Sequence, residues 1–150
     1  MFLTALVYFI SFTCFVNSAI DFDGLTKDKL SELEEKAMKV CVEKHNINET
    51  LLEDVLQEKA PIPTSREFKC MLGCYNEELG YGKGTVPQWD VMKKVHELEY
   101  EKQEDKEKSF KLVEICKNKV PEEAEDYCEL GYAMFTCYAE ESKQLGLELL

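Results

Sequence analysis

The chain has 150 residues, of which 45% are hydrophobic and 32% are charged, and its 30 acidic side chains outnumber its 18 basic ones. This composition predicts one compact domain with a hydrophobic core, and it excludes a disordered or fibrous chain. The formal net charge of −12 argues against nucleic acid and anionic membranes, because both recruit Lys and Arg. We therefore expect a highly soluble protein that does not bind nucleic acid.

The chain begins with an apolar segment that carries no ionised side chain, MFLTALVYFISFTCFVNSA. A segment of this length is either a membrane span or a secretory signal peptide. Its polar end, with the small residues Ser18 and Ala19, resembles a cleavage site, and an acidic stretch follows. We therefore predict a signal peptide over residues 1–19, cleaved near residues 18–20. The mature domain would cover residues 20–150 and be secreted into an extracellular fluid.

Apolar residues at helical spacing continue through most of the mature chain. The first predicted helix covers residues 26–46, and Asn48 is expected to cap a short second helix that contains Leu56. The stretch APIPTS interrupts the pattern before a third helix, for which Thr64 and Glu67 form a capping box. The glycine-rich stretch GYGKG is expected to end that helix in a turn.

Three more helices are predicted in the second half of the chain. Thr85 and Gln88 form another capping box, ahead of a fourth helix with an apolar stripe. Residues 97–109 are rich in Glu and Lys and predict a solvated helix face. An apolar stripe follows over residues 110–116. The last long helix is predicted at about residues 122–142. Because no stretch alternates polar and apolar residues convincingly, we predict an all-α domain of six helices.

The cysteines predict a disulfide framework. Cys14 lies in the predicted signal peptide, which leaves an even number in a secreted chain. The six remaining cysteines are Cys41, Cys70, Cys74, Cys116, Cys128 and Cys137.

Helix geometry limits how these cysteines pair. Cys70 and Cys74 are one turn apart on one helix, so their Cβ atoms lie about 5–6 Å apart, whereas a relaxed disulfide needs about 3.5–4.5 Å. Cys128 and Cys137 lie about 13 Å apart on opposite faces of the last helix. Excluding these two pairs leaves about 10 of the 15 connectivities open.

Metal and thiol chemistry are the competing interpretations. Cys41, His45, Cys70 and Cys74 could converge on zinc, but a second short Cys/His pair is missing, so no metal site is predicted. Six paired cysteines leave no thiolate nucleophile, and no other catalytic constellation is present. We therefore predict that the protein is not an enzyme and needs no cofactor.

The cysteine spacing resembles that of a known family. The gaps between successive cysteines are 28, 3, 41, 11 and 8 residues, and FKC and DYCE surround Cys70 and Cys128. This pattern resembles the six-cysteine signature of the insect odorant-binding proteins, which include the pheromone-binding proteins. The resemblance spans the whole mature chain. It implies six helices around an apolar cavity, cross-linked by three disulfides, Cys41–Cys74, Cys70–Cys128 and Cys116–Cys137.

The resemblance also implies which side chains contact a ligand. The positions that match ligand-facing positions of the family are Leu72, Phe110, Val113, Met134 and Tyr138. Amphipathicity alone adds Leu56, Trp89 and Met92. Flexible thioether, aromatic and branched groups of this kind would accept several apolar shapes.

These observations predict a secreted carrier of small hydrophobic molecules, odorants or pheromones, through aqueous fluid. A membrane receptor is a candidate partner, and the expected state is a monomer or a weak homodimer. One alternative is a salivary, glandular or haemolymph scavenger of amines or lipids, and an amine binder would need a buried acid from the first or fourth helix. Another is a cross-linked helical protein that acts through protein–protein contacts, with a filled core and an exposed apolar patch.

Two further features bear on ligand release. His45 and His96 are expected to be exposed polar residues, while a sharper hypothesis makes His96 a pH sensor near the cavity. The tail LGLELL is hypothesised to cover or enter the cavity, and protonation of Glu148 would shift it. Removal of the chain after Gln144 would then change ligand affinity or its pH dependence.

Overall fold

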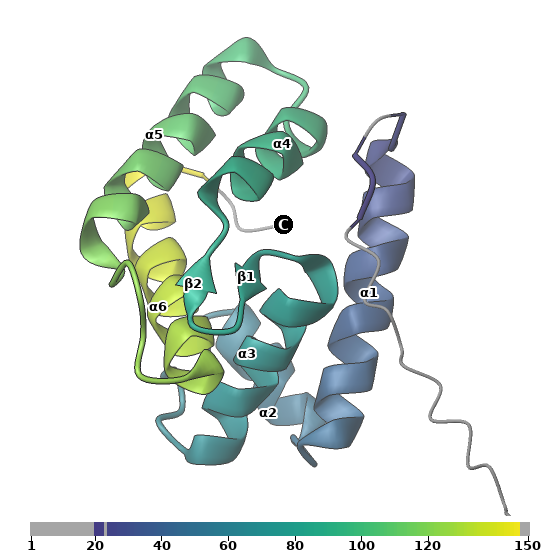
Figure 1. Cartoon of the computed structure of the whole chain (residues 1–150), viewed down its shortest axis with the longest axis vertical. Coiled ribbons are helices and arrows are strands. Elements are labelled where there is room, and N and C mark those ends of the chain that lie inside the picture. Colours follow the sequence, from purple (N-terminus) through teal and green to yellow (C-terminus); the bar gives the residue numbers. More distant parts are fainter. Residues whose placement is uncertain (1–19, 23, 148–150) are drawn as a thin grey trace, which may run out of the picture.

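The computed structural model describes residues 20–22 and 24–147, and it contains six α-helices and one short β-hairpin within them (Figure 1). The predicted all-α architecture with six helices is confirmed. The predicted signal peptide lies outside the described residues. The helices are α1 (Lys27–Lys44), α2 (Glu49–Leu56), α3 (Arg66–Leu79), α4 (Trp89–Glu99), α5 (Gln103–Lys119) and α6 (Tyr127–Leu145).

The first two helices begin where their capping residues predict. The Thr26 hydroxyl accepts a hydrogen bond from the Lys29 backbone N–H at 3.3 Å and caps α1. The Asn48 side chain accepts from the Leu51 N–H at 3.1 Å and caps α2, as predicted.

Two other helix starts differ from the prediction. The cap of α3 is Ser65 rather than Thr64, because the Ser65 hydroxyl accepts from the Phe68 N–H. The last helix begins at Tyr127, five residues later than predicted, because the Asp126 carboxylate accepts from two N–H groups of its first turn. The acidic run before it is not helical, although its charges suit the first turn of a helix.

A β-hairpin that the sequence did not predict follows α3. Gly80, with φ of +71°, ends that helix, and β1 (Gly82–Lys83) then pairs antiparallel with β2 (Val86–Pro87). Strands of two residues are too short to show the alternation that marks a strand. Thr85 lies in this hairpin, so the predicted second capping box is wrong, and α4 begins without a side-chain cap.

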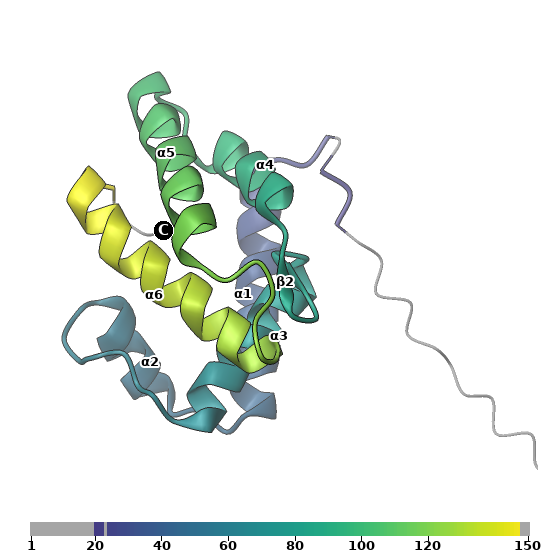
Figure 2. The same cartoon turned by 60° about the vertical axis from the view of Figure 1, so that its left-hand side comes forward.

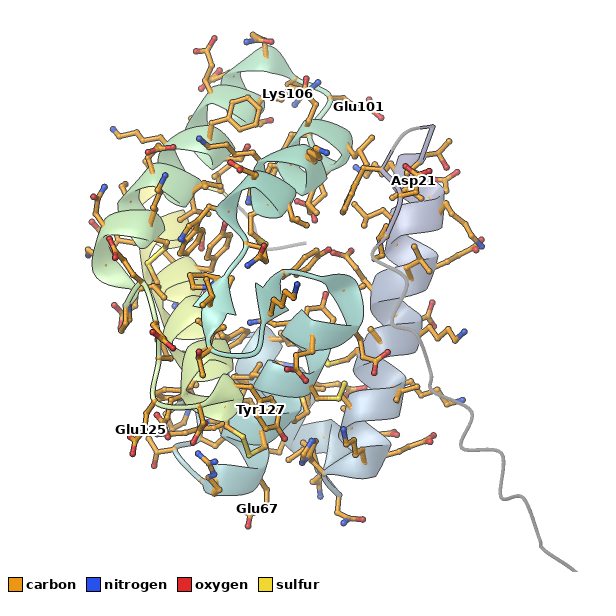
Figure 3. The ribbon with its side chains drawn as sticks, viewed as in Figure 1. Asp21, Glu67, Glu101, Lys106, Glu125 and Tyr127 are labelled. Carbon is orange, nitrogen blue, oxygen red and sulfur yellow. A yellow bond between two sulfur atoms is a disulfide. The ribbon has the colours of Figure 1, made fainter. Side chains whose placement is uncertain are left out.

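Three disulfides connect the helices with the predicted pairing. Cys41–Cys74 joins α1 to α3, Cys70–Cys128 joins α3 to the start of α6, and Cys116–Cys137 joins α5 to α6. The two cysteines of α3 therefore anchor different neighbours, as their spacing indicates. Charged side chains lie around the outside of this framework, including Glu67, Glu101 and Glu125 (Figure 3).

The closest helix contact is between α3 and α6, and two glycines allow it. A Cβ atom added to Gly131 would lie 2.2 Å from the Gly73 backbone nitrogen, and one added to Gly73 would lie 2.3 Å from the Tyr127 carbonyl oxygen. Neither position can accept a side chain without separating the helices. Figure 2 shows α6 running through the molecule with α5 on one side and α2 on the other.

The buried apolar side chains form two clusters. The larger cluster draws on every helix except α2, and the smaller one on α1, α2 and α3. Among the described residues, no helix is long and apolar enough to cross a bilayer. Residues of both clusters line the site.

A candidate ligand cavity

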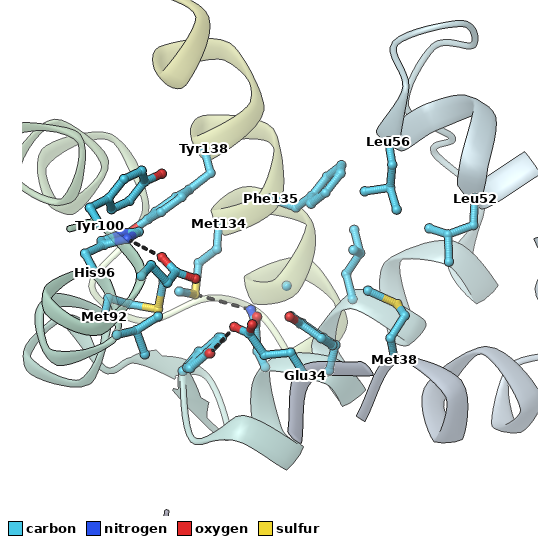
Figure 4. Close-up of a pocket in the computed structure, with 17 residues that line it drawn as sticks. Glu34, Met38, Leu52, Leu56, Met92, His96, Tyr100, Met134, Phe135 and Tyr138 are labelled. Carbon is cyan, nitrogen blue, oxygen red and sulfur yellow. Dashed lines mark hydrogen bonds and ion pairs between the residues drawn. The ribbon is translucent and has the colours of Figure 1, made fainter. Parts of the chain in front are cut away.

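A cavity of about 220 Å³ lies inside the bundle, and 17 residues line it (Figure 4). Sites for drug-sized molecules usually measure about 300–1,000 Å³, so this one suits a small ligand. Every helix except α5 contributes to the wall. The lining residues are Glu34, Met38, Leu52, Leu56, Leu72, Tyr75, Asn76, Tyr81, Met92, Val95, His96, Glu99, Tyr100, Gly131, Met134, Phe135 and Tyr138.

The cavity has an aliphatic side and a polar side. Met38 of α1 lies with Leu52 and Leu56 of α2 on one side, and His96 and Tyr138 lie on the other (Figure 4). Thioether and branched side chains of this kind adapt to ligands of different shape. Polar side chains of the wall, among them Glu34, His96 and Tyr138, can fix the orientation of a ligand.

A hydrogen-bonded chain connects α4 with α6 on the polar side. The Nδ1 atom of His96 lies 2.8 Å from a carboxylate oxygen of Glu99, and its Nε2 atom lies 3.2 Å from the Tyr138 hydroxyl. Because the carboxylate can only accept, Nδ1 donates to it, and a neutral His96 then accepts from Tyr138 through Nε2. The rings of His96 and Tyr138 also stack, with centroids 5.7 Å apart. This chain fixes the ring of Tyr138 against the cavity.

A second polar contact lies on α1, where the Tyr81 hydroxyl donates to Glu34 Oε1 at 2.5 Å. Burial raises the pKa of Glu34, the hydrogen bond from Tyr81 opposes this shift, and the charge of Glu99 adds to it. Burial also raises the pKa of Tyr81 and of Tyr75, and it raises the pKa of Tyr100 to about 12. The tyrosine hydroxyls of the cavity therefore stay protonated at physiological pH.

The structure places five of the eight predicted ligand contacts in the cavity wall, namely Leu56, Leu72, Met92, Met134 and Tyr138. The other three, Trp89, Phe110 and Val113, lie elsewhere. Val113 is fully buried in the larger core cluster, where α5 packs on α4 and α6, and Trp89 packs against the same cluster from the start of α4. Val113 therefore meets neighbouring helices rather than the cavity, and Phe110 is partly buried outside the cavity wall.

Sequence reasoning missed most of the polar wall. The expectation that His96 is exposed is wrong, because it is only 5% exposed, whereas the alternative hypothesis, which places it near the cavity, agrees with its position in the wall. The sequence does indicate that Glu34 is partly buried. Glu34 follows Leu30 by four residues and so lies on the apolar helical stripe that continues to Cys41. Glu99 lies one turn after His96 on the buried face of α4. Tyr81 follows a glycine turn, and no local pattern marks it.

Two surface hollows adjoin the cavity. Leu56 and Phe135 also line a hollow beside the loop between α2 and α3, and Tyr100 also lines one near the end of α6. Leu147, in the tail, is 7% exposed and lines both hollows. The role hypothesised for Glu148 lies outside the described residues.

A cross-linked six-helix bundle that encloses a small apolar cavity has the architecture of a small-ligand carrier. The PBP/GOBP family profile matches residues 24–141, and the chain belongs to this family, the insect odorant-binding proteins. Among solved structures, the Apis mellifera odorant binding protein 5 resembles it with a TM-score of 0.67 and 20% sequence identity, over 84% of this chain and 98% of that one. At this identity the likeness establishes the fold. No curated protein sequence matches the chain.

Proposed function

We propose that the chain is a secreted carrier that binds one small hydrophobic molecule, an odorant or pheromone, in this cavity and transports it through aqueous fluid. The observation that carries the proposal is the partly enclosed, largely apolar cavity between Met38, Leu52, Leu72 and Met134. Proteins normally fill such a space with side chains, because a cavity forfeits packing contacts. A ligand that occupies it restores those contacts.

The expected affinity follows from the apolar surface that the ligand buries. A ligand that removes about 250 Å² of apolar surface from water gains about 6 kcal/mol at about 25 cal/mol per Å². Before the cost of association is subtracted, this free energy corresponds to a dissociation constant on the order of tens of micromolar; that cost weakens binding, and well-placed polar contacts strengthen it. Such binding is reversible, as a carrier requires.

The proposal can be tested by displacement of the neutral fluorescent probe N-phenyl-1-naphthylamine from the oxidised mature protein. We expect the probe to bind and small apolar alcohols and esters to displace it. Met38→Trp replaces a flexible thioether at the cavity wall with a bulky indole ring. It should weaken probe binding at least about fivefold, because the ring takes up space that the probe needs. Val40→Trp is the matched control, because Val40 lies on the same helix and is 43% exposed. Equal effects of the two substitutions, or no probe binding at all, would contradict the proposal.

A further inference from the structure

The charge in the cavity is one-sided. Glu34 and Glu99 line it together with His96, and no lysine or arginine from the described part of the chain does so. With both carboxylates ionised, one negative charge remains in excess even when His96 is protonated. Partial enclosure strengthens the field of that charge, because the surrounding dielectric constant is lower than that of water.

Glu34 is the carboxylate that lacks a counter-ion. Glu99 pairs with His96 at 2.8 Å, whereas Glu34 accepts one hydrogen bond, from Tyr81, and forms no ion pair with any described side chain. Burial and the nearby Glu99 both disfavour its ionised form, and together they raise its pKa. A cation placed beside Glu34 would offset both effects by direct attraction.

Tyr75 offers an unused hydroxyl in the same cavity. Its side chain lines the wall beside Tyr81, with ring centroids 6.1 Å apart, and its hydroxyl forms no hydrogen bond with the described residues. Burial raises its pKa, so the hydroxyl stays protonated and its oxygen can accept from a ligand N–H group. The neighbouring aromatic faces also attract ammonium groups.

From this arrangement we infer that the preferred ligand is a small apolar amine, bound as its ammonium ion. Its N–H groups donate to Glu34 and Tyr75, and its hydrocarbon part extends toward Met38, Leu52 and Leu56. The inference rests on the proposed carrier function and names the ligand class of the same cavity. A bare metal ion does not fit, because the described residues contain no group of three or more metal-binding side chains.

The polarity of the cavity sets the shape of this ligand. Glu34 lies between the side that carries His96 and the side that carries Leu56 (Figure 4). A primary amine with a single short alkyl or arylalkyl group can therefore reach Glu34 while its apolar part lies on the aliphatic wall. An uncharged ligand of the same size fills the same space but leaves Glu34 without a cation.

The inference can be tested with two pairs of isosteric ligands, 2-phenylethylamine with 2-phenylethanol and hexylamine with 1-hexanol. Each ligand displaces N-phenyl-1-naphthylamine from the mature protein at about pH 7.5. The quantity compared is the ratio of amine to alcohol affinity, and we expect a ratio of at least about ten in the native protein. Glu34→Gln should lower this ratio at least about tenfold, because it removes the charge and keeps the acceptor for Tyr81. Glu35→Gln, an exposed neighbour on the same helix, should leave the ratio unchanged.

The outcomes separate this inference from the proposed function. If the alcohols displace the probe and the amines bind no more tightly, the protein is a carrier of neutral ligands and the inference is wrong. It is also wrong if Glu34→Gln and Glu35→Gln lower the ratio equally, because the effect is then one of overall charge. If neither the probe nor any of these ligands binds, the carrier function itself fails and the inference fails with it.

Discussion

The contact between α3 and α6 makes a quantitative prediction about Gly131→Ala. The added methyl group would meet the Gly73 nitrogen at 2.2 Å and the Leu72 carbonyl carbon at 2.5 Å, and both are backbone atoms that no side-chain rotation can move. Overpacking of this kind costs about 3 kcal/mol or more, while the better helix propensity of alanine returns about 1 kcal/mol. We therefore expect a net loss of at least about 2 kcal/mol in the free energy of unfolding.

For a domain of this size, such a loss lowers the Tm by about 8 °C. Far-UV circular dichroism of the oxidised protein during heating measures this change. Gly82→Ala is the graded control, because its Cβ would lie 3.0 Å from the end of the flexible Leu130 side chain and at an ordinary contact distance of 3.5 Å from the Asn76 Cβ. It should cost clearly less than Gly131→Ala. If both variants unfold within about 2 °C of the native protein, helix contact through the two glycines is not what positions α6 against α3.

Three further predictions concern charges and caps. Because burial raises the pKa of Glu34 above 4.5, the folded state binds its proton more readily than the unfolded state, and this group favours folding less as pH rises. Glu34→Gln should therefore stabilise the protein more at about pH 7.5 than at about pH 5 in urea titrations, and the reverse order would contradict the burial of this carboxylate. Lys119→Met should lower the free energy of unfolding by about 2 kcal/mol in the same assay. The side chain of Glu141 is only 7% exposed, and the Lys119 ammonium, 2.5 Å away, is the cation that pairs with it. Ser65→Ala should lower the free energy of unfolding by about 1 kcal/mol, and Thr64→Ala should lower it much less. Equal losses would mean that Thr64 caps α3 as the sequence predicts.

The sequence predicts the framework because its signals are local or covalent. Asn48 caps its own helix through a contact three residues away, and the spacing of Cys70 and Cys74 excludes their mutual disulfide whatever surrounds them. The start of α6 shows the limit of such signals. Several acidic residues precede Tyr127, and only the structure shows that the Asp126 side chain accepts the free N–H groups.

The cavity wall is less predictable because it depends on how helices pack. Phe110, Val113 and Met134 all lie on apolar helical stripes, yet only Met134 faces the cavity. A stripe shows that a face is buried and does not show whether a helix or an empty space lies opposite. The charged side chains of the wall are even harder to predict from the sequence, since Glu34 is one of 30 acidic residues. Its hydrogen-bond partner in the wall, Tyr81, is 47 residues away in the sequence.

The positions of the disulfides explain how the fold tolerates an open space. A cavity of about 220 Å³ forfeits about 5 kcal/mol at about 24 cal/mol per Å³, which is comparable to the contribution of two cross-links at about 2–4 kcal/mol each. The three cross-links hold α1, α3, α5 and α6 to one another, and neither α2 nor α4 contains a cysteine. The wall that α4 supplies is held instead by packing of α4 on α5 and by the contact of His96 with Tyr138. Leu52 and Leu56 of α2 have neither a cross-link nor such a hydrogen bond to hold them. We expect the α2 side of the wall to adjust to the length of the hydrocarbon part of the ligand, while the polar side around Glu34 and His96 keeps its geometry.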